Sequence, residues 1–279
     1  MRDITVAAVC MHSRVGHVKE NLERMERFLD EAVSRGCDIV CFPELSISGY
    51  KLNGPQSLYD HQFSQYIIAR VVELAQDKKV VILAGMIEVG AKGLPYISQL
   101  VTTPFGLMGI YRKTHLSPME EGNFAAGDEI AVFSHDGVTF GVQLCWEAHF
   151  PELSTIMALK GVEIIFMPHA SPRTGPNEKF QSWLRHMRSR AYDNATYIVA
   201  CNQVGPTSEG YIFPGVAIII DPAGHIMAYR AEETEGMIVT TLKAELITAI
   251  KSHPIRYFLP HRRPELYKDL TRNPIGRTK

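Results

Sequence analysis

Apolar positions along this chain follow two patterns that alternate with each other. Short apolar runs, many of them with period-two alternation, are typical of buried strands, whereas apolar residues three and four apart are typical of helices that cover a sheet. The runs predict strands over residues 4–10, 38–42, 80–84, 97–102, 107–112, 130–133, 138–144, 162–167, 197–202, 215–220 and 237–242. The helical spacing predicts helices over residues 17–35, 62–78, 151–160 and 178–195.

The order of these elements, strand then helix with hairpin-like strand pairs between, predicts an α/β fold. No repeat or low-complexity linker divides the chain, so we expect one α/β domain over residues 1–242. Residues 243–279 form a tail that mixes aromatic, proline and charged residues. Because such a tail is too apolar to remain free in water, we expect it to pack on the body or on a second subunit.

Composition restricts the partners of this chain. Its 279 residues include 29 Lys and Arg against 30 Asp and Glu, a formal net charge of -1, which favours a small-molecule ligand over nucleic acid or a membrane surface. No apolar segment reaches the length of a membrane span, and no export signal is evident. The five cysteines are scattered without a CxxC pair, so neither a disulfide framework nor a zinc site is indicated. We therefore expect a cytoplasmic protein.

Cys145 is the first candidate for chemistry, because it stands where the strand 138–144 stops and Pro151 is about to open a helix. Backbone N–H groups at a helix N-terminus favour negative charge, so such a corner is expected to lower the pKa of the thiol and to stabilise an oxyanion beside it. The alternative is a buried structural cysteine, which is common. The rest of the chain has to decide between the two.

Glu44 and Lys113 also come directly after apolar strands. In α/β sheets, strand ends at one edge converge on the ligand crevice. A carboxylate there can take the proton of a thiol and later activate water, while a lysine supplies positive charge for the oxyanion. Taken singly, Glu44 could be a capping carboxylate and Lys113 a solvated charge. Their joint placement with Cys145 favours acyl-transfer chemistry.

Three segments, FPELSISGY (42–50), YRKTHL (111–116) and GVQLCWEAHFPEL (141–153), resemble the three signature blocks of the nitrilase superfamily of carbon–nitrogen hydrolases. The resemblance extends over about residues 4–242. It implies a four-layer αββα sandwich that commonly pairs into a dimer, and a catalytic triad formed by Glu44, Lys113 and Cys145. It implies no cofactor and no metal.

Further site residues follow from the same resemblance. A second glutamate of the family is matched by Glu120 rather than Glu121, counting back from Gly127, although both could be solvated loop residues. The remaining expected substrate contacts follow the nucleophile or end strands and blocks: Trp146, Glu147, His169, Ala170 and Tyr50. Trp146 and Glu147 could instead simply pack and cap the next helix. His169 has no partners at metal-ligand spacing.

Substrate preference is read from what the blocks lack. The triplet CWE also occurs in true nitrilases, but the W-G-x-G element that follows their lysine is missing here. Ala148 and His149 stand where related D-amino-acid carbamoylases carry two carboxylate-binding arginines, although Arg173 could replace them. We therefore predict hydrolysis of a small linear amide or N-carbamoyl amine through a thioester, by a homodimer or higher homo-oligomer. The alternatives are a nitrilase and a catalytically silent binding scaffold.

Overall fold

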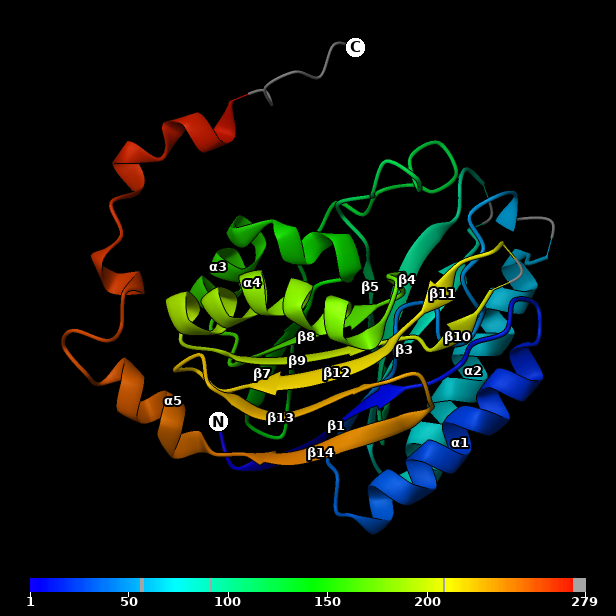
Figure 1. The fold of residues 1–279 in the computed structure, drawn as a ribbon, viewed down its shortest axis with the longest axis horizontal. Helices are drawn as coiled ribbons and strands as arrows, with labels where there is room; N and C mark the ends of the chain where they lie inside the picture. Colours follow the sequence, from blue (N-terminus) through cyan, green and yellow to red (C-terminus); the bar gives the residue numbers. More distant parts are fainter. Residues whose placement is uncertain (56–57, 91, 208, 273–279) are drawn as a thin grey trace.

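Two sheets packed face to face organise the structure (Figure 1). The computed structural model describes residues 1–55, 58–90, 92–207 and 209–272, and within them each of these sheets has six strands. The first sheet has the order β14 (Gly236–Leu242), β1 (Ile4–Cys10), β2 (Ile39–Cys41), β3 (Val81–Glu88), β4 (Tyr96–Thr103) and β5 (Gly106–Arg112). The second has the order β13 (Ile226–Glu232), β12 (Gly215–Ile220), β9 (Tyr197–Asn202), β8 (Ile164–His169), β7 (Val138–Val142) and β6 (Val132–His135).

The two sheets share one pairing scheme. In the first sheet β1, β2 and β3 are parallel, and in the second β7, β8 and β9 are parallel. The outer strands of each sheet pair antiparallel to these. Parallel strands need covering on both faces, and here the facing sheet covers the inner side while helices cover the outer side.

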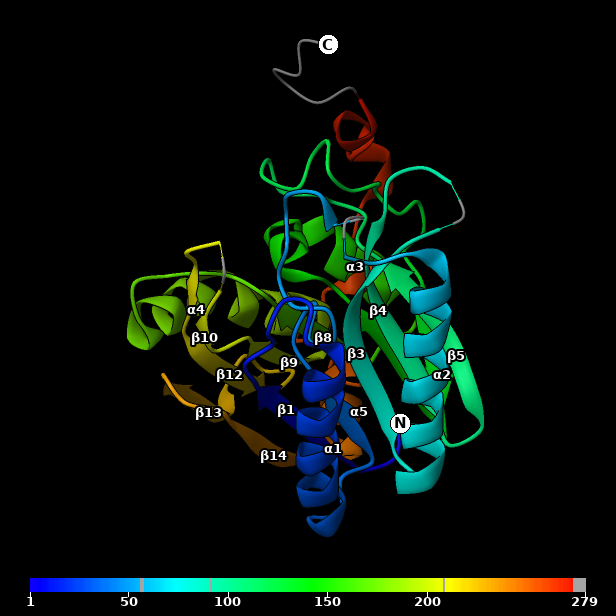
Figure 2. The same ribbon diagram turned by 90° about the vertical axis from the view of Figure 1, so that its right-hand side faces the viewer.

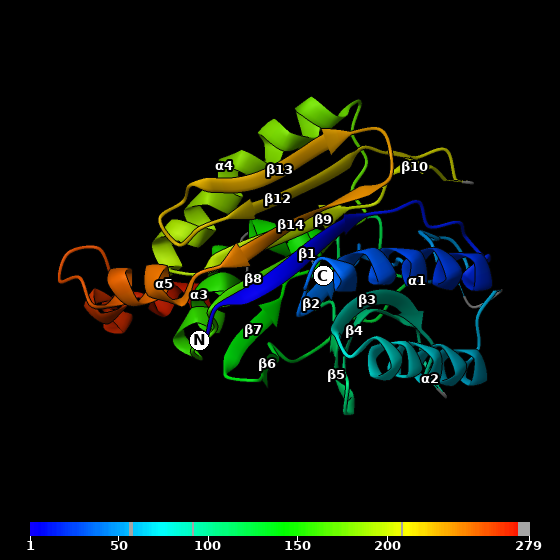
Figure 3. The ribbon, with the colours of Figure 1, turned by 90° about the horizontal axis from the view of Figure 1, so that it is seen from below.

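Helices complete the four layers (Figures 2 and 3). The first sheet is covered by α1 (Val18–Ser34) and α2 (His61–Lys78), and the second by α3 (Pro151–Leu159) and α4 (Pro176–Asn194). The predicted αββα sandwich is therefore confirmed. Among the described residues, every helix is too short or too polar to cross a bilayer.

Local sequence explains where these helices lie. Helix α1 buries an apolar stripe at helical spacing, composed of Val18, Leu22, Met25, Leu29 and Ala32. Helix α2 begins at the N-cap Asp60, whose side chain accepts a hydrogen bond from the N–H of Phe63 at 2.7 Å. Helix α4 carries Pro176 in its first turn, where a missing N–H costs nothing. The predicted helix ends agree with the observed ones within about two residues.

Several strands were missed or misjudged in extent. Strand β13 was not predicted, because it is an edge strand whose charged residues Arg230 and Glu232 hide its apolar pattern. The short hairpin of β10 (Gly205–Pro206) and β11 (Ile212–Phe213) was also missed. Strand β7 ends at Val142, two residues earlier than predicted, since the chain already turns toward Cys145 there.

The tail beyond Lys243 begins with α5 (Ala244–Lys251) and continues in short 3-10 turns at Leu259–His261, Pro264–Leu266 and Lys268–Thr271. It passes outside α3 and α4 (Figure 1), where the ring of Phe258 lies 5.3 Å from that of Tyr192. Tyr267 and Leu270 line a groove together with Ile156 of α3. Ile255 and Leu270 remain 77% and 62% exposed. Residues 273–279 lie outside the described residues.

We predict that this tail covers a second copy of the chain, because its exposed apolar residues favour association. Sedimentation at micromolar concentration should give at least a dimer for the full chain, and a smaller species for a chain that ends at Lys243. Circular dichroism of the shortened chain controls for loss of folding. A monomeric full chain would contradict the prediction.

Candidate active site

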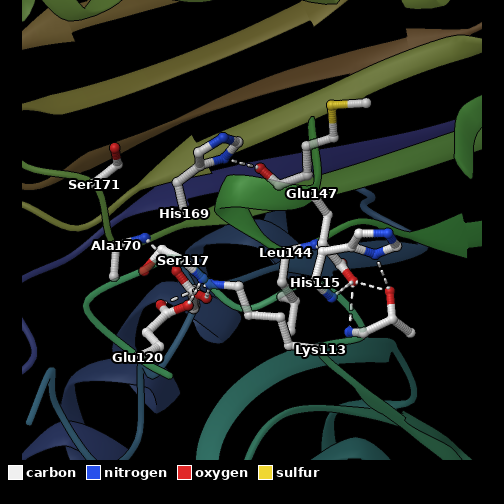
Figure 4. Close-up of polar contacts among 12 residues, drawn as sticks. Lys113, His115, Ser117, Glu120, Leu144, Glu147, His169, Ala170 and Ser171 are labelled. Carbon is white, nitrogen blue, oxygen red and sulfur yellow. Dashed lines mark hydrogen bonds and ion pairs between the residues drawn. The ribbon is translucent and has the colours of Figure 1, made fainter. Parts of the chain in front are cut away.

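The three strand-end residues predicted from the sequence meet at the seam between the sheets. Nζ of Lys113, which follows β5, donates hydrogen bonds to Oε1 of Glu44 and to Oε1 of Glu120, each at 2.8 Å (Figure 4). Glu44 follows β2, and Cys145 follows β7 and interacts electrostatically with both Glu44 and Lys113. The side chains of Glu44 and Lys113 are fully buried. Four ionisable groups are thus gathered in one buried place.

Backbone amides hold the outer oxygens of both glutamates. Oε2 of Glu44 accepts a hydrogen bond from the N–H of Ala170 at 3.0 Å, and Oε2 of Glu120 accepts one from the N–H of Ser117 at 2.7 Å. The backbone carbonyl of Glu44 accepts a further bond from Nε2 of Gln203 at 2.8 Å. Since Ala170 and Gln203 belong to the second sheet, Glu44 is fixed from both sheets. Sequence patterns contain no signal for such backbone donors.

Glycine allows the chain to approach closely beside Glu44. A Cβ on Gly85 of β3 would lie 2.2 Å from the backbone nitrogen of Leu45, so a larger residue cannot occupy this position without shifting the turn. Leu45 itself has φ of 55°, which is rare for a residue with a side chain. The turn that presents Glu44 is therefore pressed against β3 in a constrained conformation.

Cys145 is also in a constrained conformation. It has φ of 47° and opens a 3-10 turn over Cys145–His149, after which α3 begins. Positive φ at a non-glycine residue costs on the order of 1–3 kcal/mol and persists only where the surroundings impose it. This backbone conformation turns the chain sharply between β7 and α3, as the sequence had indicated for the corner.

Glu147 supplies that imposition. Its buried carboxylate accepts hydrogen bonds from the N–H of Leu144 at 2.6 Å, the hydroxyl of Tyr111 at 2.9 Å and the N–H of Thr114 at 2.7 Å. It thereby ties the nucleophile turn to the segment that follows Lys113. All of these bonds lie within the protein, so we assign Glu147 a positioning role in place of the substrate contact expected from the sequence.

The electrostatics of the thiol differ from expectation. Burial raises the pKa of Cys145 to about 12, and the carboxylate of Glu44 raises it too, against the opposing charges of Lys113 and Lys179. The predicted lowering of this pKa by the helix N-terminus is therefore corrected, because desolvation and a neighbouring carboxylate outweigh it. At neutral pH the resting nucleophile is a thiol rather than a thiolate.

The partners of the thiol are poised to take its proton. Burial raises the pKa of Glu44 to about 6, although Lys113 opposes this, and the carboxylate of Glu120 raises it further. Burial would lower the pKa of Lys113, but Glu44 and Glu120 together raise it well above its ordinary value. Lys113 is thus a permanent cation, and Glu44 is a carboxylate base at neutral pH.

The other expected substrate contacts lie around this group. Tyr50 is buried and packs edge-on against Phe213, with ring centroids 5.3 Å apart, so the missed hairpin forms part of its surroundings. His169 and Ala170 follow one another at the end of β8, beside Glu120 and Lys113 (Figure 4). Trp146 is 38% exposed and lines a cavity of about 730 Å³ with residues that follow Lys113 and Glu120. Within the described residues, no three His, Cys, Asp or Glu side chains group as metal ligands.

Known proteins share this sequence and fold. A family model described as carbon–nitrogen hydrolase matches residues 5–252. A probable nitrilase of Schizosaccharomyces pombe is 30% identical over 271 residues, covering 95% of this chain and 97% of its own. An N-carbamoylputrescine amidase of Solanum tuberosum is 29% identical, over 96% of this chain and 95% of its own. A solved amidase variant from Nesterenkonia AN1 superposes with a TM-score of 0.84 at 19% identity, covering 96% and 97% of the two chains.

The sandwich of two sheets therefore has the fold of the nitrilase superfamily, and the sequence resemblance to it is confirmed. The chain belongs to the carbon–nitrogen hydrolase family.

We predict that Cys145 reacts with a neutral thiol reagent such as methyl methanethiosulfonate only as the pH rises above the ordinary cysteine value of 9.0, because burial and Glu44 raise its pKa. Glu44→Gln removes one of these causes and should shift the labelling profile to lower pH. Mass spectrometry of Cys145 after timed labelling measures both profiles, with a free cysteine peptide as reference. A labelling rate that is already at its plateau near neutral pH would contradict this.

Proposed function

We propose that this protein is a cysteine-dependent hydrolase of non-peptide C–N bonds that acts on a small linear amide or an N-carbamoyl amine. The observation that supports this most directly is the buried Lys113, which is held between Glu44 and Glu120 and interacts electrostatically with the Cys145 thiol. A permanent cation, a base and a nucleophile in one water-poor place are the groups that acyl transfer requires.

In the first half of the reaction, Sγ of Cys145 attacks the carbonyl carbon while Glu44 takes the thiol proton. The pKa values of about 12 and about 6 make a free thiolate unfavourable, so proton transfer accompanies attack. Nζ of Lys113 and a backbone N–H of the nucleophile turn stabilise the oxyanion. Glu44 returns the proton to the nitrogen, ammonia or an amine leaves, and a thioester remains on Cys145.

In the second half, Glu44 deprotonates a water that attacks the thioester carbon. The tetrahedral intermediate collapses with cleavage of the C–S bond, the proton returns to sulfur, and the acid leaves. Glu120 fixes Lys113 throughout, because its hydrogen bond keeps Nζ in place as charge moves on the oxyanion. In this scheme, one carboxylate therefore serves both halves of the reaction.

Names of related proteins support this assignment. The relatives include an (R)-stereoselective amidase of Pseudomonas sp and N-carbamoylputrescine amidases of plants. In the amidase from Nesterenkonia sp. AN1, acrylamide adds to the active-site cysteine. The probable nitrilase among the relatives keeps a nitrile substrate as the alternative, and a silent scaffold is disfavoured because all the reactive groups are assembled.

A panel of simple amides, N-carbamoyl amines and nitriles tests the proposal, scored by ammonia release with Cys145→Ala as the blank. We expect turnover of amides or carbamoyl amines, an acyl adduct on Cys145 by mass spectrometry of a slow substrate, and loss of activity to the blank in Cys145→Ala. Nitriles faster than every amide would favour the nitrilase alternative. An acyl adduct on another residue would remove Cys145 from the mechanism.

The pH profile tests the role of Glu44. Because its pKa is raised from 4.5 to about 6, the base is lost by protonation as the pH falls through about 6, so kcat/KM should decline there rather than near 4.5. Initial rates from pH 4 to 8 with an uncharged amide measure this limb. A midpoint at the ordinary glutamate value would assign the base to another group.

A further inference from the structure

Lys179 is a buried lysine that the mechanism above does not use. It lies on the apolar stripe of α4, four residues before Trp183 and eight before Met187, and is 4% exposed. Its Nζ donates a hydrogen bond to the hydroxyl of Ser171 and forms no ion pair with a carboxylate of the described residues. Burying an ammonium group without a counter-charge is costly, so this position calls for an explanation.

The lysine belongs to the wall of the active site. Ser171 directly follows Ala170, whose N–H holds Glu44. Ser171 is itself fixed by Asn202, which accepts its N–H at 2.9 Å and donates to its carbonyl at 3.0 Å. Helix α4 also packs against the nucleophile turn. The charge of Lys179 acts on Cys145, so the two lie in one electrostatic environment.

This wall has donors without acceptors. The indole N–H of Trp183, which is 1% exposed, has no hydrogen-bond partner, and Nζ of Lys179 lies 5.7 Å from the centroid of the same ring. The exposed Arg173 adds positive charge near Lys179. Buried donors normally have partners, and an unpaired one costs about 1–3 kcal/mol. The missing acceptor is best supplied by a ligand that carries negative charge.

We propose that Lys179, with Ser171 and the indole N–H of Trp183, binds a carboxylate of the substrate, so that the substrate is an amide or N-carbamoyl compound with a carboxylate at its other end. This inference rests on the proposed function and narrows its substrate class. The overall net charge of -1 does not oppose it, because the field that a bound substrate meets is set by the few charges beside it.

Matched substrates test the proposal. Succinamate is compared with butyramide, and 3-ureidopropanoate with propylurea, so that each pair differs mainly in the carboxylate. For wild type we expect kcat/KM to favour the carboxylated member. In Lys179→Met this preference should fall on the order of 10- to 100-fold, mainly through KM, because a charge-assisted hydrogen bond is lost. Lys179→Arg should retain most of it.

Controls separate charge from folding. Arg185→Met removes an exposed cation of the same helix and should leave the preference as in wild type. Circular dichroism and thermal unfolding establish that the Lys179 variants are folded. A preference that is absent in wild type, or unchanged in a folded Lys179→Met, overturns the proposal. An equal loss of kcat on both members of each pair also overturns it, because Lys179 would then serve the reacting atoms.

A second readout uses pH. Burial lowers the pKa of Lys179 to about 8, with Cys145, Arg173, Glu44 and Glu178 as its charged surroundings. As the pH rises through about 8 the cation is lost, so the preference of wild type for the carboxylated member should decline. Titration of Cys145 or Glu44 affects both members alike and cancels in the ratio. A preference independent of pH between 7 and 9 overturns the proposal.

Binding without turnover separates this inference from the proposed function. Calorimetric titration of Cys145→Ala with succinamate should give binding that is lost when Lys179→Met is added. If no substrate releases ammonia from wild type, the proposed function fails, whereas Lys179-dependent succinamate binding would still support the carboxylate site. Binding that is equal with and without Lys179→Met overturns the site even where amides are hydrolysed.

Discussion

A lysine buried between two glutamates is the interaction on which this structure depends. Removing Lys113, Glu44 and Glu120 from water costs several kcal/mol per ion, and close geometry with additional backbone donors has to offset that cost. The amides of Ala170 and Ser117 provide those donors. Because the group needs contributions from both sheets, its charges are stable only where the sandwich closes over them. The fold and the chemistry therefore share one requirement.

Rigid backbone at the nucleophile follows from the same logic. Cys145 has a positive φ, and the carboxylate of Glu147 holds the turn in that conformation from the segment after Lys113. Close packing of Gly85 against Leu45 does the same for Glu44. A reaction in which one carboxylate moves protons in both directions gains from groups that do not reorganise between steps. Conformational strain and buried charge thus both serve to preset the distances.

The sequence predicted the layers and the reactive residues because these follow from periodicity and from strand ends. Glu44, Lys113 and Cys145 each come after an apolar run, and parallel strands bring such ends together. The raised pKa of Cys145 was not predictable, because burial and the distance to a carboxylate are tertiary quantities. The hydrogen bonds of Glu147 likewise join segments distant in sequence. Lys179 did leave a signal, a charged residue in register with the apolar stripe of α4, which was not recognised.

The amide of Ala170 and the side-chain amide of Gln203 both reach Glu44 from the opposite sheet. During synthesis the first sheet lacks its last strand, β14, until nearly the whole chain has emerged, and Glu44 has no amide partners until β8 and β9 are docked. A half-formed sandwich would therefore leave the base in water and the thiol unassisted. Nascent chains would stay chemically inert toward cellular amides, and competence would arise in one step when the two halves meet.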